Sequence, residues 1–400
     1  MKNSSGEVMF LKRGEQLSET ACTGVSLHCH SLHSKELLDF VPYYAERIPV
    51  ASYFWRRSMQ RHAENGLMPD FRSGYWEPPL TGVEVFESES NSLSKLGLES
   101  IVSITDHDSI GANLELCRST SVKRAPISLE WTVPFENAFF HIGVHNLPIE
   151  QAETITEGLL EYTYSKCGPD NKRLSELLEM LNELSGVLVV LNHPIWDIEM
   201  IGQQEHERAL RNILDRYSLW IHALEINGFR SWEENKAVID LANSIGKPII
   251  SGGDRHCCQS NTMVNVTDAR SFSEFADEIR IDGSSRIAVT PGYHVPLPVR
   301  QLRSMAQILA NYKHFPTDRR LWSDRVFLDY HDGLGLRSLT ETWNGHRPLW
   351  TYFTFFALSL LAHPVMEPFI SLTVGDNDIG REESRPLETA FPINAALAGQ

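Results

Sequence analysis

The segment Gly24-Val-Ser-Leu-His-Cys-His-Ser31 ends a short apolar run with two histidines, His28 and His30. Val25–Cys29 has the β-branched and apolar content of a strand. Because successive side chains of a strand alternate between its two faces, we expect both imidazoles on one face and Cys29 on the other. Two imidazoles at one strand end suggest a ligand site, and the rest of the chain shows whether the pattern recurs.

Similar apolar runs that end in polar residues recur along the chain and predict further strands. They are Ile101–Thr105, Ile127–Trp131, Phe139–Val144, Val187–Leu191, His222–Ile226, Pro248–Ser251, Met263–Val266 and Arg286–Thr290. Helical periodicity separates the later ones, with leucines from 174 to 184, apolar residues from 210 to 214, and a segment from Trp232 to about Ser244 that Gly246 ends. This alternation favours a parallel sheet, open or closed into a barrel, with ligands at the C-terminal strand ends.

Histidines and carboxylates gather at these strand ends. Asp254 and His256 repeat the two-residue spacing, and His107 lies in Thr-Asp-His-Asp between Asp106 and Asp108. The remaining members of the set are Glu130, His141 and His193. Imidazole and carboxylate groups are ligands of Zn²⁺, Mn²⁺ and Fe²⁺, and so many of them exceed what one ion requires. The joint pattern predicts a multinuclear metal site.

The ordered motifs resemble those of the PHP (polymerase and histidinol phosphatase) family. They are Leu-His-Cys-His-Ser, Ile-Thr-Asp-His-Asp-Ser-Ile, the glutamate of Leu-Glu-Trp, Phe-His-Ile-Gly, Asn-His-Pro and Gly-Gly-Asp-Arg-His, between about residues 24 and 290. The resemblance implies a distorted seven-stranded β/α barrel with a trinuclear metal site that hydrolyses phosphate esters. It assigns His28, His30, Glu130 and Asp254 to the first metal, Glu130, His141 and His193 to the second, and His107 and His256 to the third.

One position departs from that family. Many members have an aspartate ligand of the third metal where this chain has Lys35, and others have a histidine one residue later, where this chain has Glu36. We favour Glu36 as the replacement ligand, with His33 and Asp39 as rivals. Alternatively, Lys35 binds substrate phosphate, which would leave two metals. The expected cofactors are therefore two or three divalent ions of Mn, Zn or Fe.

The expected reaction is hydrolysis of a phosphate ester, of a nucleotide or short oligonucleotide, by a metal-bridging hydroxide. The candidate catalytic residues are His256, Asp254, Lys35 and Asp106. Asp106 and Asp108 could orient a ligand by accepting an imidazole N–H. Glu225 could support the ligands, and Arg230 could meet a phosphate. A C–N bond amidohydrolase on a similar barrel and a non-catalytic PHP scaffold stay open as alternatives.

We expect two parts, a phosphoesterase domain over 1–295 and a mostly helical extension over 296–400 with a polar tail from Gly375. An insertion at about 37–96, rich in aromatic and arginine residues, is expected either as a helical lid that stacks a base or as a packing insert. The apolar segment Leu349–Ala362 is expected as a buried or dimer-forming helix, because about 21 Å of helix does not span a ~30 Å hydrocarbon core.

Composition limits the partners and the compartment. A net charge of −16 argues against long duplex nucleic acid, although bound cations can still present a positive pocket to a small phosphorylated substrate. With 42% hydrophobic and 22% charged residues, the chain can form a folded core. Six cysteines without a C-x-x-C pair and an N-terminus without an apolar signal segment predict a cytoplasmic protein with no stable membrane span.

Overall fold

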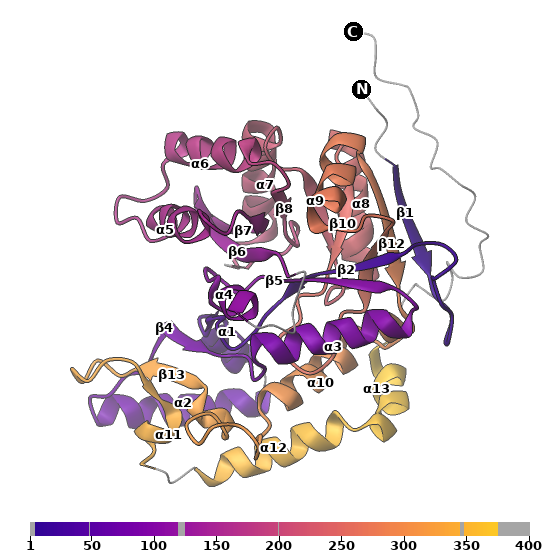
Figure 1. The fold of residues 1–400 in the computed structure, drawn as a ribbon. Coiled ribbons are helices and arrows are strands. Elements are labelled where there is room, and N and C mark those ends of the chain that lie inside the picture. Colours follow the sequence, from indigo (N-terminus) through magenta and orange to yellow (C-terminus); the bar gives the residue numbers. More distant parts are fainter. Residues whose placement is uncertain (1–4, 48, 119–124, 199, 345–347, 375–400) are drawn as a thin grey trace.

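The protein has a mixed α/β fold built on three sheets, as Figure 1 shows. The computed structural model describes residues 5–47, 49–118, 125–198, 200–344 and 348–374. The first sheet has the order β1 (Ser5–Phe10), β12 (Ser284–Val289), β11 (Met263–Thr267), β2 (Thr23–Cys29), β5 (Glu99–Ile104). The second has the order β10 (Ile249–Gly252), β9 (Ala223–Asn227), β8 (Leu188–Leu191), β7 (Ala138–Leu147), β6 (Ile127–Phe135). All nine strands expected from the sequence are therefore present, and β1 is an addition.

The expectation of a parallel sheet is wrong for several strand pairs. β7 is antiparallel to both β6 and β8, and β11 is antiparallel to both β2 and β12. Only Glu136 and Asn137 connect β6 to β7, and so short a connection joins antiparallel strands because a parallel pair needs a long crossover. Strand–helix alternation did not reveal this hairpin.

The closed seven-stranded barrel is not confirmed. Within the described residues the strands form two five-stranded sheets that share a buried core, and the β-bridges between the two sheets are isolated ones, Cys29 with Arg255 and His107 with Glu130. Both bridges lie at or beside candidate ligands. The backbone there is irregular, because the pairing of β2 with β5 changes register between Ser26 and Cys29.

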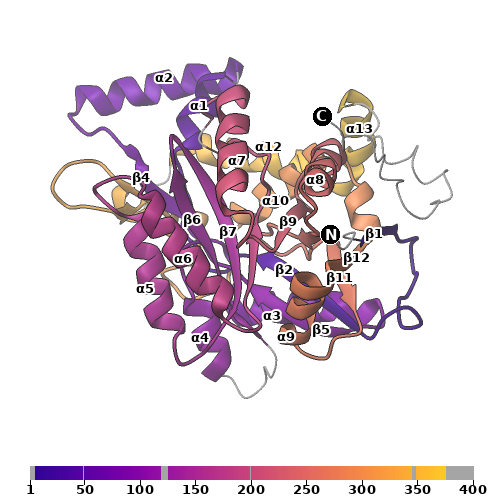
Figure 2. The same cartoon turned by 90° about the horizontal axis from the view of Figure 1, so that it is seen from above.

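Helices cover the outer faces of these sheets. Figure 2 shows α5 (Ala152–Thr163) and α6 (Asn171–Glu183) beside β6 and β7. The leucines expected as one stripe of α6, from Leu174 to Leu181, are buried in the main core. Further helices are α3 (Gly82–Lys95), α4 (Gly111–Arg118), α7 (Gln203–Tyr217), α8 (Trp232–Ile245) and α9 (Phe272–Asp277). α8 ends as expected at Gly246, whose φ of 67° is left-handed.

The third sheet unites the insertion with the C-terminal extension. Its order is β14 (Arg337–Ser338), β13 (Val326–Asp329), β4 (Asp70–Trp76), β3 (Glu36–Leu37). The insertion adds helices α1 (Phe40–Arg47) and α2 (Pro49–Glu64), which lie near β4 and β13 in Figure 1. α3, from the end of the expected insertion, instead packs on β5 and β2. The strands of the two segments pair directly, so neither forms this layer alone.

The extension contains strands as well as the expected helices. Its helices are α10 (Leu297–Ile308), α11 (Leu339–Thr342), α12 (Leu349–Leu361) and α13 (Glu367–Val374). The expected polar tail from Gly375 lies outside the described residues. Within the described part of the chain, no single helix is both long enough and apolar enough to cross a membrane. The segments Thr351–Leu361 and Pro364–Ile370 reach that length and apolar character only when they are taken together, and they are bent by 63° relative to each other.

Candidate metal centre

Glu130 lies at the centre of the predicted ligands and is fully buried. Its Oε2 atom is near His28 Nε2 (3.0 Å), His30 Nε2 (3.3 Å) and His107 Nδ1 (3.4 Å). Its Oε1 atom is 3.2 Å from both His141 Nδ1 and His193 Nε2. The two oxygens therefore face two different sets of imidazoles, as a carboxylate shared between two ions would.

The donor atoms form four overlapping groups in which all atoms lie within 4.8 Å of one another. The groups are His28, His30 and Asp254; His28, Glu130 and His193; His107, Glu130 and His141; and His30, Glu36, His107 and His256. Every residue that we predicted as a metal ligand belongs to at least one group. The strand ends therefore bring these nine side chains together from distant parts of the sequence.

Glu36 completes the fourth group. Its Oε2 lies 3.1 Å from His256 Nε2 and 3.3 Å from His107 Nε2. Ser34 donates a hydrogen bond of 2.6 Å to Glu36 Oε1 and so fixes the carboxylate. The neighbouring Lys35 is exposed, with its Nζ 5.0 Å from the centre of the Tyr75 ring. Side-chain alternation thus sends Glu36 inward and Lys35 away from the donor groups.

The two rivals of Glu36 lie outside the four groups. His33 Nε2 is 3.2 Å from the carboxylate of Glu115 on α4. Asp39, between β3 and α1, contributes no donor atom to any group found among the described residues. Neither side chain therefore competes with Glu36 for the fourth group.

The donor set suits cations better than it suits hydrogen bonding. His30 Nε2, His107 Nδ1 and His141 Nδ1 are buried without a hydrogen-bond partner among the described residues. A buried polar atom without a hydrogen-bond partner lowers the stability of the fold by about 1–3 kcal/mol. Two ligands placed tetrahedrally at about 2.1 Å from one ion are about 3.4 Å apart, close to the separations around Glu130. The described residues thus fit divalent metal binding.

Burial and neighbouring charges shift the pKa values of the ligands in both directions. Burial, helped by nearby His256, lowers the pKa of His30 to about 4. Burial also lowers the pKa of His141 to about 4, although Glu130 opposes this. Burial opposes the ionisation of Glu130 itself, yet His28 and His107 outweigh it and hold its pKa well below the usual range. At neutral pH His30 and His141 are therefore neutral and Glu130 is ionised. Burial opposes protonation of His28 and His107 as well, but the nearby carboxylates outweigh it, raising the pKa of His28 and bringing that of His107 to about 10.

Glu225 orients two of the ligands. Its Oε1 atom lies 2.6 Å from His28 Nδ1, and its Oε2 atom accepts a 2.9 Å hydrogen bond from the backbone N–H of His193. This contact leaves His28 Nε2 to face Glu130. Sequence reasoning raised Glu225 as a supporting candidate but missed Asn192, whose amide donates to Glu130 Oε1 at 2.9 Å. The position of Asn192 directly before His193 was the available signal.

Asp106 and Asp108 act on the backbone and not on an imidazole. Asp106 accepts hydrogen bonds from the backbone N–H and the hydroxyl of Ser31, and it therefore fixes the turn directly after His30. Asp108 accepts from the backbone N–H of Thr132 at 2.9 Å and from the Tyr164 hydroxyl at 3.2 Å. Among the described residues, neither Asp106 nor Asp108 accepts a hydrogen bond from the imidazole of a ligand, contrary to the expectation.

Three of the ligands have left-handed backbones, with φ of 61° at His28, 27° at His193 and 49° at Asp254. This conformation is uncommon outside glycine and costs about 1–3 kcal/mol per residue. Simple strand alternation is therefore the wrong reason for the convergence of His28 and His30, whose ring centres lie 5.1 Å apart. The register shift at the end of β2, together with the left-handed backbone of His28, produces it instead.

A cation and two indole rings border the donor groups. Arg230 lies with Cζ 3.5 Å from the Trp196 ring centre and Nη2 3.5 Å from Asp254 Oδ2. Trp76, from β4, lies 5.7 Å from the His256 ring. The insertion thus contributes an aromatic ring to this end of the sheets, and Glu36 directly precedes the insertion.

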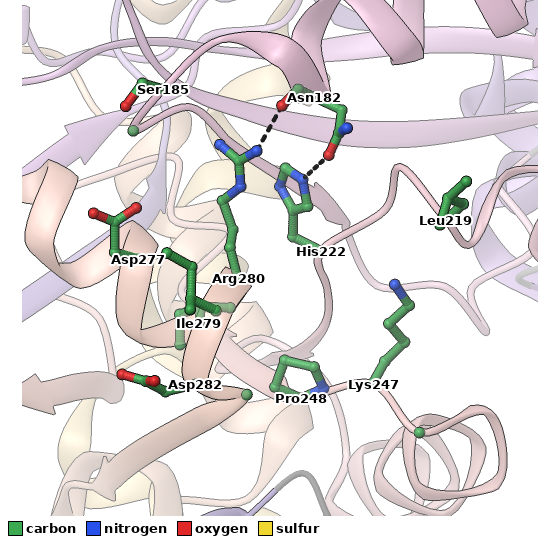
Figure 3. A pocket seen from close by; sticks show the side chains of 14 residues that line it. Asn182, Ser185, Leu219, His222, Lys247, Pro248, Asp277, Ile279, Arg280 and Asp282 are labelled. Atoms are coloured by element: carbon green, nitrogen blue, oxygen red, sulfur yellow. Dashed lines mark hydrogen bonds between the residues drawn. The ribbon is translucent and has the colours of Figure 1, made fainter. Parts of the chain in front are cut away.

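A larger cavity lies at the opposite strand ends and is separate from the metal centre. Its volume is about 450 Å³, and Figure 3 shows His222, Lys247 and Arg280 in its wall. Arg280 donates to the backbone carbonyls of Asn182 (2.6 Å) and Leu184 (2.9 Å) at the end of α6. None of the four donor groups found in the described residues includes a residue of this cavity. Arg280 thus satisfies backbone carbonyl groups at the end of α6.

Comparison with known proteins leaves the family open. No family model and no curated protein matches the chain. Among solved structures, PsfC from Pseudomonas syringae is similar at 13% identity and TM-score 0.38, over 68% of this chain and 93% of PsfC. A candidate metal-dependent phosphoesterase from Bifidobacterium adolescentis is similar at 12% identity and TM-score 0.35, over 65% of this chain and 97% of that one. An amidohydrolase from Chromobacterium violaceum with bound sulfate and no metal is similar at 18% identity and TM-score 0.29, over 45% of this chain and 83% of the amidohydrolase. The chemistry of this chain therefore rests on its own site.

Proposed function

We propose that this protein is a metal-dependent hydrolase of phosphate esters. The observation that carries the proposal is the buried Glu130 carboxylate, with one oxygen toward His28 and His30 and the other toward His141 and His193. The chemistry that two or three divalent ions (Mn, Zn or Fe) supply at such a centre is a lowered pKa of water and neutralisation of charge on the phosphate oxygens. The geometry thus supports hydrolysis of an anionic ester.

The residues of the chain would position the reacting groups. Glu225 holds the ring of His28, and Asp106 holds the turn after His30, so the ligands are preorganised. The guanidinium of Arg230, stacked on Trp196 beside Asp254, would donate hydrogen bonds to a phosphate oxygen. His256 would protonate the leaving group only in a two-ion centre, because its Nδ1 lies 2.9 Å from the carbonyl oxygen of Asp254 and its other nitrogen belongs to the fourth donor group.

The substrate class that we propose is a nucleotide or short oligonucleotide. Helices α1 and α2 follow Glu36 in the chain and expose the aromatic side chains Tyr43, Tyr44, Tyr53 and Phe54. The same helices expose Arg47, Arg56, Arg57 and Arg61. Aromatic rings stack on bases and arginines bind the phosphate backbone, so this surface suits a single strand. It also places a local positive charge on a chain of net charge −16.

The direct test is His193→Ala, which removes one imidazole facing Glu130 Oε1. Phosphatase activity with Mn²⁺ should fall by at least 100-fold toward p-nitrophenyl phosphate, nucleotides and oligonucleotides, while the thermal unfolding curve stays cooperative. Retained turnover in this variant would contradict the proposal. Parallel assays on cyclic amides separate the amidohydrolase alternative, and metal analysis of purified protein separates a non-catalytic scaffold, which would contain no metal.

A further inference from the structure

We propose that the outer face of α12 and α13 joins two copies of this chain. The face consists of large apolar side chains, each between 53% and 75% exposed. They are Tyr352, Phe353, Phe356, Leu360, Val365 and Phe369. Tyr352, Phe356 and Leu360 follow at intervals of four residues and so form one stripe along α12.

The opposite side of the same helices anchors them to the body of the protein. Phe355 packs on Trp322 at a ring distance of 5.2 Å, and Thr351 is buried. Arg303, on α10, forms a 2.6 Å ion pair with Glu367 at the start of α13. Figure 1 shows α12 along the lower edge of the molecule, with α10 above it in this view. The apolar stripe is therefore held outward on a fixed helix.

The exposed area matches one side of a stable dimer. An aromatic side chain can bury about 150–250 Å², so six large side chains at roughly two-thirds exposure offer about 600–900 Å². A standard interface buries about 800 Å² from each partner. Monomeric proteins rarely leave so large a contiguous apolar patch in water. The size of this apolar face thus indicates that another protein surface packs against it.

The charges around the face favour a second copy over a membrane. The chain has no Lys or Arg from residue 349 to 374, whereas helices that lie on membranes carry cations for anionic lipids. The net charge of −16 would add repulsion from such a surface. A two-fold axis, by contrast, brings the same patch against itself, and an uncharged patch meets its copy without like-charge repulsion. We therefore commit to an isologous dimer.

The experiment is sedimentation velocity with the full chain from 1 to 100 µM. We expect a dimer, and we expect Phe356→Asp to raise its dissociation constant at least tenfold, because a carboxylate would be buried against apolar side chains. Tyr53→Asp is the matched control, since Tyr53 is 61% exposed on α2 outside the face, and this variant should stay dimeric. Thermal melting checks that both variants are folded.

Two results would overturn the proposal. One is a wild-type chain that is monomeric at 100 µM. The other is a Phe356→Asp variant that is folded and as dimeric as the wild type. Wild-type protein that floats with phosphatidylcholine vesicles while sedimenting as a monomer would assign the face to a lipid surface instead.

Discussion

At the scale of single residues, Glu225 is the carboxylate on which two predicted ligands depend. Its oxygens hold His28 Nδ1 and the backbone N–H of His193. In Glu225→Gln the amide keeps the shape but loses the charge that supports the imidazole. We expect the apparent metal affinity to fall 10- to 100-fold, as for other partners of metal ligands, in a titration with Mn²⁺ or Zn²⁺.

A matched control is Glu115→Gln, because Glu115 also contacts a histidine, His33, but outside the four donor groups. Its metal affinity should equal that of the wild type. Equal losses in both variants would mean that general electrostatics, and not orientation of His28, sets the affinity.

Gly252 is needed because Glu225 occupies the space beside it. A Cβ atom at position 252 would lie 1.6 Å from Glu225 Oε1 and 2.9 Å from the Cβ of His28. We expect Gly252→Ala to lower the free energy of unfolding by about 1–3 kcal/mol, measured in urea, and to weaken metal binding in parallel. In Gly158→Ala, on α5, the nearest atom is 3.9 Å away, so this variant should be neutral or more stable by about 0.5–1 kcal/mol.

At the scale of elements, the third sheet connects the C-terminal extension to a ligand. β3, which carries Glu36, pairs with β4, and β4 pairs with β13 of the extension. Leu328 on β13 is buried and fills the space over Gly74 on β4. Leu328→Ala should therefore cost about 2–5 kcal/mol of unfolding free energy and loosen the strand that holds Glu36.

The expected consequence is a selective loss of metal. Analysis of bound metal after dialysis should show the ion near Glu36 leaving Leu328→Ala before those near Glu130. Leu336→Ala is the control, because Leu336 belongs to the same extension but is exposed. If Leu328→Ala loses all ions together, then Glu36 does not depend on this sheet.

The sequence predicted the strands better than their pairing. Apolar runs located nine of the ten strands in the two main sheets, since burial determines composition. Pairing depends on contacts between residues that are distant in sequence. The sequence therefore contains no clear signal for β1, which pairs with β12, or for the short strands β3, β13 and β14. The ligands followed from residue types at strand ends. Their convergence could not be derived correctly, because alternation does not reveal the left-handed backbone of His28.

At the scale of the whole molecule, the two ends of the strands have different chemistry. One end gathers the carboxylates and imidazoles of the metal centre. The other end contains the cavity with His222, Lys247 and Arg280, where burial lowers the pKa of each group. The pKa of His222 falls to about 3, mainly by burial and then by the charges of Arg280 and Lys247. This end should thus determine part of the acid stability of the protein.

The hydrogen bonds of His222 explain why the fold needs its neutral ring. The backbone N–H of Val189 donates to Nδ1 at 2.9 Å, so Nδ1 must lack a proton. Nε2 lies 3.0 Å from Asn182 Oδ1, and a dashed line in Figure 3 marks this contact. Protonation would break the bond that joins the start of β8 to the start of β9. The unfolded ring, in contrast, takes a proton near its ordinary pKa of 6.5.

Because the unfolded state then binds one proton more than the folded state, His222 destabilises the fold as pH falls from 6.5 toward 3. The expected slope is about 1 kcal/mol per pH unit, measured by urea unfolding at pH 7, 6 and 5. His222→Asn lacks this proton uptake, so its deficit relative to wild type should shrink as pH falls. A His222→Asn deficit that is constant from pH 7 to 5 would mean that the folded ring accepts its proton as readily as the unfolded one.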